Sequence, residues 1–196
     1  MAGTADVISR MERLPGNHYP VLVPNMKGLE GVLELLAKQP SSSSTPPPTD
    51  EIAIFAAATE AFSKANTNCT IAESLERLGT VTRKALEHGL RVRGCVPRFL
   101  FTTKRTEPRY SRYVSVVISC PYEGSVDPQK VKAVTQALLD MGCYEVSLGD
   151  TVGTGTPSTV RAMLETVMGG SGSITADKLA VRVIYGQVLP ILISSL

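Results

Sequence analysis

The sequence has no tryptophan, and aromatic residues make up only 5% of it. Binding of single-stranded nucleic acid by stacking needs exposed aromatic side chains, so the composition argues against nucleic acid as a partner. Histidine is also scarce, since His18 and His88 are the only two. Four cysteines are scattered without a CxxC pair. That spacing argues against a structural zinc site or a disulfide framework and favours reduced thiols in an intracellular compartment.

Long apolar runs are missing as well. The most apolar stretch, residues 179–196, is interrupted by Arg182, Gln187 and Pro190, so we expect no membrane span. Residues 1–14 carry several charges and lack the apolar run of a signal peptide, so no targeting segment is visible. With 43% hydrophobic residues and a net charge of +2, the composition is typical of a soluble globular protein.

Apolar runs and helical patterns alternate about five times along the chain. Runs predicted to be strands occupy residues 19–23, 51–56, 90–93 with a continuation at 113–118, 144–148 and 179–184. Continuous apolar runs indicate strands buried on both faces, and the alternation with helices predicts an α/β fold with a parallel sheet. Residues 39–50 are rich in serine and proline and are predicted to form an extended loop.

Helix starts are marked by capping residues. Thr70 followed by Glu73 has the spacing of a capping box, and Asp127 precedes a proline at the first helical position. Thr156 before Pro157 begins a helix whose apolar positions predict a buried face. That face comprises Val160, Met163, Leu164 and Val167.

The segment Gly149-Asp150-Thr151-Val152-Gly153-Thr154-Gly155-Thr156-Pro157 follows a predicted strand and precedes a predicted helix. In a β/α protein such strand ends handle ligands. Asp150 beside Thr151 suits binding of a metal or a substrate carboxylate, and the alternative is that the two residues cap the loop and the next helix. Gly153 and Gly155 also suggest a phosphate loop, but no Gly-Lys-Ser/Thr follows them.

Other strand-end groups are candidates of the same kind. They are Asn25, Thr59, Glu60, Ser119, Cys120 and Ser147. Cys120 and Cys143 are interpreted either as reactive thiols or as core residues, and cysteine near strands favours the core.

Five motifs occur together in one order. They are Glu51-Ile52-Ala53-Ile54-Phe55-Ala56-Ala57-Ala58-Thr59-Glu60, Asn66-Thr67-Asn68-Cys69, Cys120-Pro121-Tyr122-Glu123-Gly124, Met141-Gly142-Cys143-Tyr144-Glu145 and the segment that begins at Gly149. With them the chain closely resembles the 3-hydroxy-3-methylglutaryl-coenzyme A lyases, which are DRE-TIM metallolyases. The resemblance implies a partial TIM (β/α)8 barrel, with residues 1–196 forming a single incomplete domain. A complete barrel takes about 250 residues, so we expect a truncated copy.

The resemblance implies a carbon–carbon lyase that cleaves 3-hydroxy-3-methylglutaryl-CoA to acetyl-CoA and acetoacetate, in leucine degradation and ketone-body formation. It also implies an acyl-CoA substrate, a Mg²⁺ or Mn²⁺ cofactor that acts as a Lewis acid, and a mitochondrial location with the peroxisome as alternative. A homodimer stays open.

Carried over position by position, the resemblance assigns six residues to substrate binding and none to catalysis. They are Thr59, Arg93, Tyr113, Ser147, Asp150 and Thr151. Thr59 stands where the family has serine, which keeps the hydroxyl.

The resemblance fails where metal ligands are expected. The family's Arg-Asp-Gly motif would precede this chain, and its His-x-His pair has no counterpart in Val181-Arg182-Val183-Ile184-Tyr185-Gly186-Gln187. We interpret His18 and His88 as solvated structural residues rather than as replacement ligands, so no residue of the chain is assigned to metal. The alternative function is therefore a catalytically inactive fragment that at most binds acyl-CoA or a partner subunit.

Residues 95–112 are a basic insertion relative to the family, where Gly94 would lead directly to Tyr113. The 18 residues hold five basic residues against one acidic residue. Three interpretations stay open: a loop that binds nucleic acid or an acidic partner, a solvated loop, or translated non-coding sequence. The last is favoured, because the insertion divides a strand that should be continuous.

Overall fold

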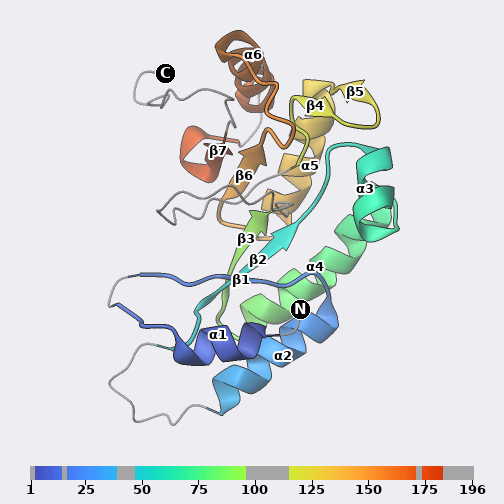
Figure 1. The fold of residues 1–196 in the computed structure, drawn as a ribbon. Helices are drawn as coiled ribbons and strands as arrows, with labels where there is room; N and C mark the ends of the chain where they lie inside the picture. Colours follow the sequence, from blue (N-terminus) through green and yellow to red (C-terminus); the bar gives the residue numbers. More distant parts are fainter. Residues whose placement is uncertain (1–2, 15–16, 39–46, 96–114, 171–173, 183–196) are drawn as a thin grey trace.

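The computed structural model describes residues 3–14, 17–38, 47–95, 115–170 and 174–182. Five strands form one parallel sheet in the order β1-β2-β3-β6-β7, and the arrowheads of β2, β3 and β6 point the same way in Figure 1. The strands are β1 (Val21–Leu22), β2 (Glu51–Phe55), β3 (Arg91–Cys95), β6 (Val146–Gly149) and β7 (Leu179–Arg182). The predicted α/β fold with about five parallel βα units is confirmed.

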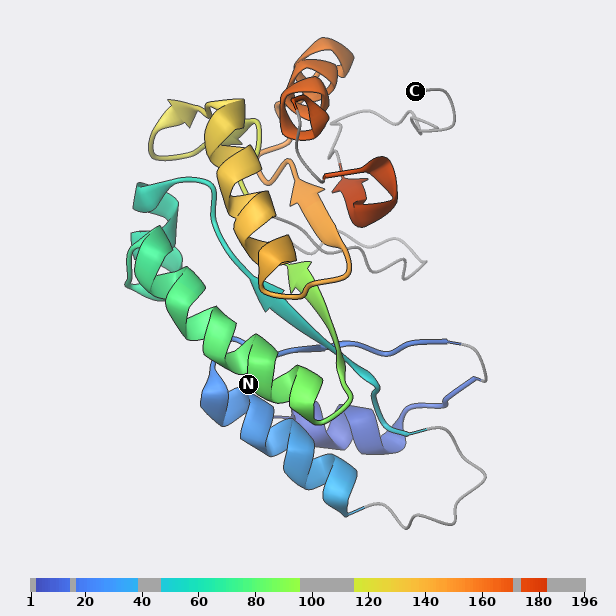
Figure 2. The same cartoon turned by 180° about the vertical axis from the view of Figure 1, so that it is seen from behind.

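Helices α4 and α5 cover one face of this sheet, with α2 beside α4 and α6 beside α5 (Figures 1 and 2). The helices are α1 (Thr4–Arg10), α2 (Met26–Ala37), α3 (Glu60–Thr67), α4 (Ile71–Glu87), α5 (Pro128–Asp140), α6 (Pro157–Met168) and the 3-10 turn η1 (Ala176–Lys178). Within the described ranges, every helix is too short or too polar to traverse a lipid bilayer.

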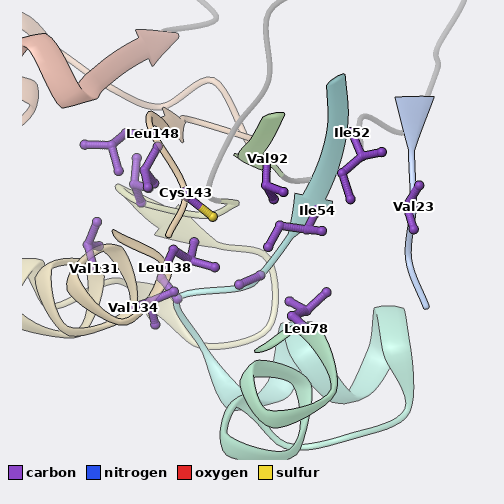
Figure 3. Close-up of a cluster of buried hydrophobic side chains, with 14 of the residues drawn as sticks. Val23, Ile52, Ile54, Leu78, Val92, Val131, Val134, Leu138, Cys143 and Leu148 are labelled. Atoms are coloured by element: carbon purple, nitrogen blue, oxygen red, sulfur yellow. The ribbon is translucent and has the colours of Figure 1, made fainter. Parts of the chain in front are cut away.

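Alternate strand residues pack against the helices. Ile52 and Ile54 of β2, Val92 of β3 and Leu148 of β6 are buried in one hydrophobic cluster (Figure 3). The helices contribute Leu78, Val131, Val134 and Leu138. Because successive side chains of a strand point to opposite faces, the remaining strand residues lie on the other side of the sheet, here called the inner face. It carries Glu51, Ala53, Phe55, Arg91, Arg93 and Ser147.

The predicted helix starts are confirmed. Thr70 and Glu73 make both hydrogen bonds of a capping box at α4. Asp127 accepts a hydrogen bond from the backbone N–H of Gln129 at α5, and Thr156 caps α6. The predicted apolar face of α6 is the face that is buried.

The strand predicted at residues 113–118 is wrong over its described part. Ser115 forms a single parallel bridge with Ala57, and the chain then turns at Val116, whose φ of 56° lies in the left-handed region. The Val116 N–H donates to Thr151 Oγ1, which draws this segment toward the end of β6. A short antiparallel hairpin follows, formed by β4 (Ser119–Cys120) and β5 (Gly124–Ser125).

Candidate functional site at the carboxyl ends of the strands

Most of the predicted site residues gather where the parallel strands end. Thr59 follows β2, Asp150 and Thr151 follow β6, and residues 115–120 lie between them. We call this group of residues the rim. The hairpin β4–β5 lies at the same end of the sheet, in the direction of the strand arrowheads (Figure 1). The rim is the place where a β/α protein binds its ligand.

Asp150 organises the loop that follows β6. Its Oδ1 accepts a hydrogen bond from the Gly153 N–H at 3.0 Å, and its Oδ2 accepts one from the Gly155 N–H at 2.7 Å. The side chain is 1% exposed. The loop-capping alternative is therefore what the geometry shows for Asp150, while the helix itself is capped by Thr156. The phosphate-loop interpretation is wrong, because the two glycine amides already bind a carboxylate of the chain.

Thr151 joins the end of β6 to residues 115–117. Its Oγ1 accepts the hydrogen bond from the Val116 N–H at 3.0 Å. The next residue along, Val117, donates from its N–H to the carbonyl of Gly149 at 3.3 Å. The Thr151 hydroxyl keeps a proton that it can donate, since it serves only as acceptor in this bond.

Thr59 contacts Cys120 across the rim. Its Oγ1 donates to Cys120 Sγ at 3.2 Å, and the Tyr122 N–H approaches the same sulfur at 3.5 Å. Thr59 is 1% exposed and Cys120 is 2% exposed. The interpretation of Cys120 as a core residue is confirmed, although the sulfur also fixes the orientation of a predicted site hydroxyl.

Ser147 is buried on the inner face of β6. It pairs with Ala180 of β7 and comes two residues before the end of its strand. Asp150 and Thr151 come three and four residues later along the chain, so three of the predicted residues come from one short stretch at the rim.

Arg93 lies at the other end of the sheet. Its Nε donates to the Tyr144 hydroxyl at 2.6 Å and lies 3.1 Å from Glu51 Oε1, and its Nη1 is 3.4 Å from Glu145 Oε1. Glu51 begins β2, and Tyr144 and Glu145 directly precede β6. We call Glu51, Arg91, Arg93, Tyr144 and Glu145 the charged floor. The guanidinium of Arg93 is thus held at the amino ends of the strands, away from the rim.

Two members of the charged floor, Arg93 and Tyr144, have a raised pKa. Burial by itself lowers the pKa of Arg93, but the nearby Glu51 carboxylate, the Tyr144 hydroxyl and Glu145 outweigh it, so the pKa is raised. Burial also raises the pKa of Tyr144, which keeps its phenol protonated. Arg91 and Arg93 both lie over the Tyr144 ring, at 4.3 and 5.0 Å from its centroid. These groups are held by one another and are charge-matched.

Several other candidates have structural roles. Asn25 caps α2 by accepting from the Gly28 N–H, and the Glu60 carboxylate accepts from the Ile71 N–H at the start of α4. His18 bonds Asp50 at 2.6 Å, and His88 contacts the Lys84 carbonyl at 2.8 Å. Neither histidine contacts the rim residues in these bonds, in agreement with their interpretation as structural residues.

The second buried thiol belongs to the core. Cys143 is 5% exposed, and burial raises its pKa to about 12. A thiol that stays protonated at neutral pH is a poor nucleophile, so the core interpretation of Cys143 is confirmed. Tyr113 and most of the basic insertion, residues 96–112, lie outside the described residues.

The rim does not fit a divalent cation over the described ranges, which contain no group of three or more histidine, cysteine, aspartate or glutamate side chains close enough to share an ion. Asp150 is the carboxylate of the rim, and each of its oxygens already accepts a hydrogen bond from a backbone amide. Mg²⁺ and Mn²⁺ prefer several oxygen ligands, and this set of side chains does not supply them.

The sequence pattern missed Ser115 as a member of the rim. It is 1% exposed and its Oγ has no hydrogen-bond partner among the described residues. Its place beside Ala57 comes from a pairing that spans the whole predicted insertion. In the sequence, Ser115 lies within the apolar run at residues 113–118, which predicts an ordinary strand residue at this position.

Comparison with known proteins gives one consistent result. A family model described as HMGL-like matches residues 32–178. A 3-hydroxy-3-isohexenylglutaryl-CoA/hydroxy-methylglutaryl-CoA lyase of Pseudomonas aeruginosa is 40% identical over 198 residues, covering 100% of this chain and 55% of the relative. A mitochondrial hydroxymethylglutaryl-CoA lyase of Bos taurus is 40% identical over 189 residues, covering 96% of this chain and 49% of the relative.

A solved structure agrees. The HMG-CoA lyase of Brucella melitensis superposes with a TM-score of 0.73 at 43% identity, covering 93% of this chain and 53% of that one. The chain thus spans about half the length of the relatives it matches. The sheet is the corresponding part of a TIM barrel, as predicted. Some relatives are named mitochondrial and others cytoplasmic.

Proposed function

Because this chain belongs to the HMGL-like family, we propose that its rim binds the acyl group of an acyl-CoA substrate of hydroxymethylglutaryl-CoA lyases. The observation that carries the proposal is the position of Thr59, Ser147 and Thr151, whose hydroxyls lie at the end of the sheet where β/α proteins bind ligands. Hydroxyl groups both donate and accept, which suits the carboxylate, tertiary alcohol and thioester oxygens of such a substrate.

Each predicted site residue receives a defined part in this proposal. Asp150 holds the loop that carries Thr151, and Thr59 is oriented by Cys120. Arg93 is predicted from the resemblance to contact substrate, but its guanidinium lies in the charged floor, so its part in this proposal is to hold the amino ends of β2, β3 and β6 together. Tyr113 stays a predicted substrate contact.

Cleavage of 3-hydroxy-3-methylglutaryl-CoA to acetyl-CoA and acetoacetate is the second candidate function, favoured by the names of relatives that are 40% identical over nearly the whole chain. The reaction removes the proton of the tertiary alcohol as the carbon–carbon bond breaks, and the departing acetyl-CoA carbanion takes up a proton. The family is metal-dependent, yet the rim does not fit a cation and Val181 to Gln187 contain no histidine. We therefore rank substrate binding above turnover, with a mitochondrial location as the accompanying proposal.

Calorimetric titration of the purified chain with 3-hydroxy-3-methylglutaryl-CoA tests the first function, and free coenzyme A serves as the control ligand. We expect the acyl-CoA to bind more tightly than coenzyme A, and equal affinities would rule out an acyl-binding rim. A lyase assay with added Mg²⁺ or Mn²⁺ tests the second. Turnover at about 1 s⁻¹ or faster would reverse the ranking of the two functions.

A further inference from the structure

Strand β3 and Ser115 share one register, although residues 96–114 separate them. Every residue of β2 pairs with the residue forty positions later, from Glu51 with Arg91 to Phe55 with Cys95. Continued along the same ladder, Ala57 would pair with position 97. Ala57 instead pairs in parallel with Ser115, which stands 18 positions after 97.

The same length of 18 residues follows from a separate observation. The motifs that resemble the lyase family join Gly94 directly to Tyr113, and 18 residues stand between those two positions. A sequence pattern and a backbone pairing therefore agree on the length of the interruption to the residue. An interruption of any other length would place Ser115 at another register.

Ser115 also lies where a longer β3 would lie. In the sheet, β3 stands between β2 and β6. Beyond the end of β3 that place is taken by residues 115–117, because Ser115 pairs with Ala57 on the β2 side and Val117 bonds Gly149 on the β6 side. Paired residues of a parallel ladder face the same way, so Ser115 faces the inner side with Ala57, opposite to Ile52 and Ile54.

We propose that Ser115 is the next inner-face residue of β3 after an inserted segment of 18 residues, and that its hydroxyl hydrogen-bonds an acyl-group oxygen of the bound acyl-CoA. The second clause rests on the proposed function. A hydroxyl that is 1% exposed and has no partner among the described residues requires an explanation, and a ligand oxygen at the rim provides one.

Deletions of defined length test the register. Removing residues 95–112 joins Gly94 to Tyr113, and removing residues 96–113 joins Cys95 to Val114; both delete 18 residues. Removing residues 95–111 or 95–113 deletes 17 or 19 residues and turns the side chains that follow to the opposite face. We expect both 18-residue deletions to raise Tm by roughly 3 °C or more, and both controls to lower it. Equal stability across the four variants, or failure of both 18-residue deletions to fold, would overturn the assignment of Ser115 to β3.

One serine variant and one threonine control variant test the ligand contact. Ser115→Ala should weaken binding of 3-hydroxy-3-methylglutaryl-CoA about fivefold and leave binding of coenzyme A unchanged. Thr82→Ala is the matched control, because Thr82 Oγ1 is also buried without a partner among the described residues but lies in α4. Equal effects of the two variants would refute the contact at Ser115. If the parent chain binds no acyl-CoA, the proposed function and the ligand contact fail together, while the deletions still decide the register.

Discussion

The two ends of the parallel sheet differ in the polar groups that they carry and in the partners of those groups. At the amino ends, the charged floor gathers two arginines, two glutamates and a tyrosine that are joined by ion pairs and one hydrogen bond. At the carboxyl ends, the rim carries hydroxyls and one carboxylate that bonds only backbone amides. The difference shows that the strong charges of this chain pair with one another at the amino ends of the strands, whereas, among the described residues, the hydroxyls of Ser115 and Thr151 keep unused hydrogen-bonding capacity at the carboxyl ends.

Removing the central carboxylate of the charged floor should have the largest effect. Glu51→Gln leaves the partly exposed Arg93 guanidinium without its nearest charge partner, and the carboxylate that is replaced belongs to a residue that is 0% exposed. We expect the free energy of unfolding in urea to fall by about 3 kcal/mol. Glu145→Gln is the control, since this glutamate is partly exposed and should cost less than about 1 kcal/mol. Equal losses would show that burial does not distinguish the two carboxylates.

Breaking the loop at the rim should cost less. Asp150→Ala removes the acceptor of two backbone amides, and we expect a loss of about 2 kcal/mol together with faster proteolysis near Gly153. Asp127→Ala removes a carboxylate that accepts one exposed amide at α5 and should cost about 1 kcal/mol. If the first variant is as stable as the second, Asp150 does not hold the loop.

Alkaline pH should lower the stability of the chain through Cys143, which directly precedes Tyr144 of the charged floor. The pKa of Cys143 is about 12 in the folded chain against an ordinary value of 9.0, so above pH 9 the unfolded state releases a proton that the folded state retains. Stability is therefore fully present below pH 9 and falls as the pH rises toward 12, by about 1.4 kcal/mol at pH 10 from this group. Urea titrations at pH 8 and pH 10 give the free energy of unfolding at each pH. The decrease between the two pH values should be smaller for Cys143→Ala than for the parent chain. An unchanged difference would mean that Cys143 is not the group concerned.

The smallest expected effect concerns the hydroxyl that faces Cys120. Thr59→Val keeps the shape of the side chain but loses its hydrogen bond to the sulfur, at a cost of about 1 kcal/mol. Thr59→Ser keeps the hydroxyl and should retain acyl-CoA affinity that Thr59→Val loses. Should both variants bind equally well, the role of Thr59 would be confined to packing.

Local signals in the sequence were sufficient for most of the fold. The capping box at Thr70 and Glu73 and the apolar face of α6 depend on residues three to four positions apart, and both are confirmed. Helix α3 has no such signal, because Ser63 is its buried position and distant groups fix its ends. The Ala61 N–H, for example, donates to Glu123, which lies 62 residues away.

The sequence predicts which residues belong to the candidate site better than it predicts which partners they contact. Asp150 and Thr151 were found because a strand end is visible in the sequence, but their partners Gly155 and Val116 require the folded loop. The contact from Thr59 to Cys120 spans 61 residues, and the direction of the Arg93 side chain depends on a glutamate of another strand. No periodicity encodes such pairings, since they follow from how the strands align.

The carboxylate of Asp150 has one further consequence. A loop with two converging glycine amides is ordinarily shaped by the anion that it binds. In this chain the anion is the carboxylate of Asp150, so the chain itself shapes the loop, and the N–H of Gly153, whose φ is 79°, has its partner without a bound substrate. Binding of the proposed acyl-CoA at Thr151 would then require little ordering of the backbone, and its affinity would depend on direct contacts rather than on the entropy of loop closure.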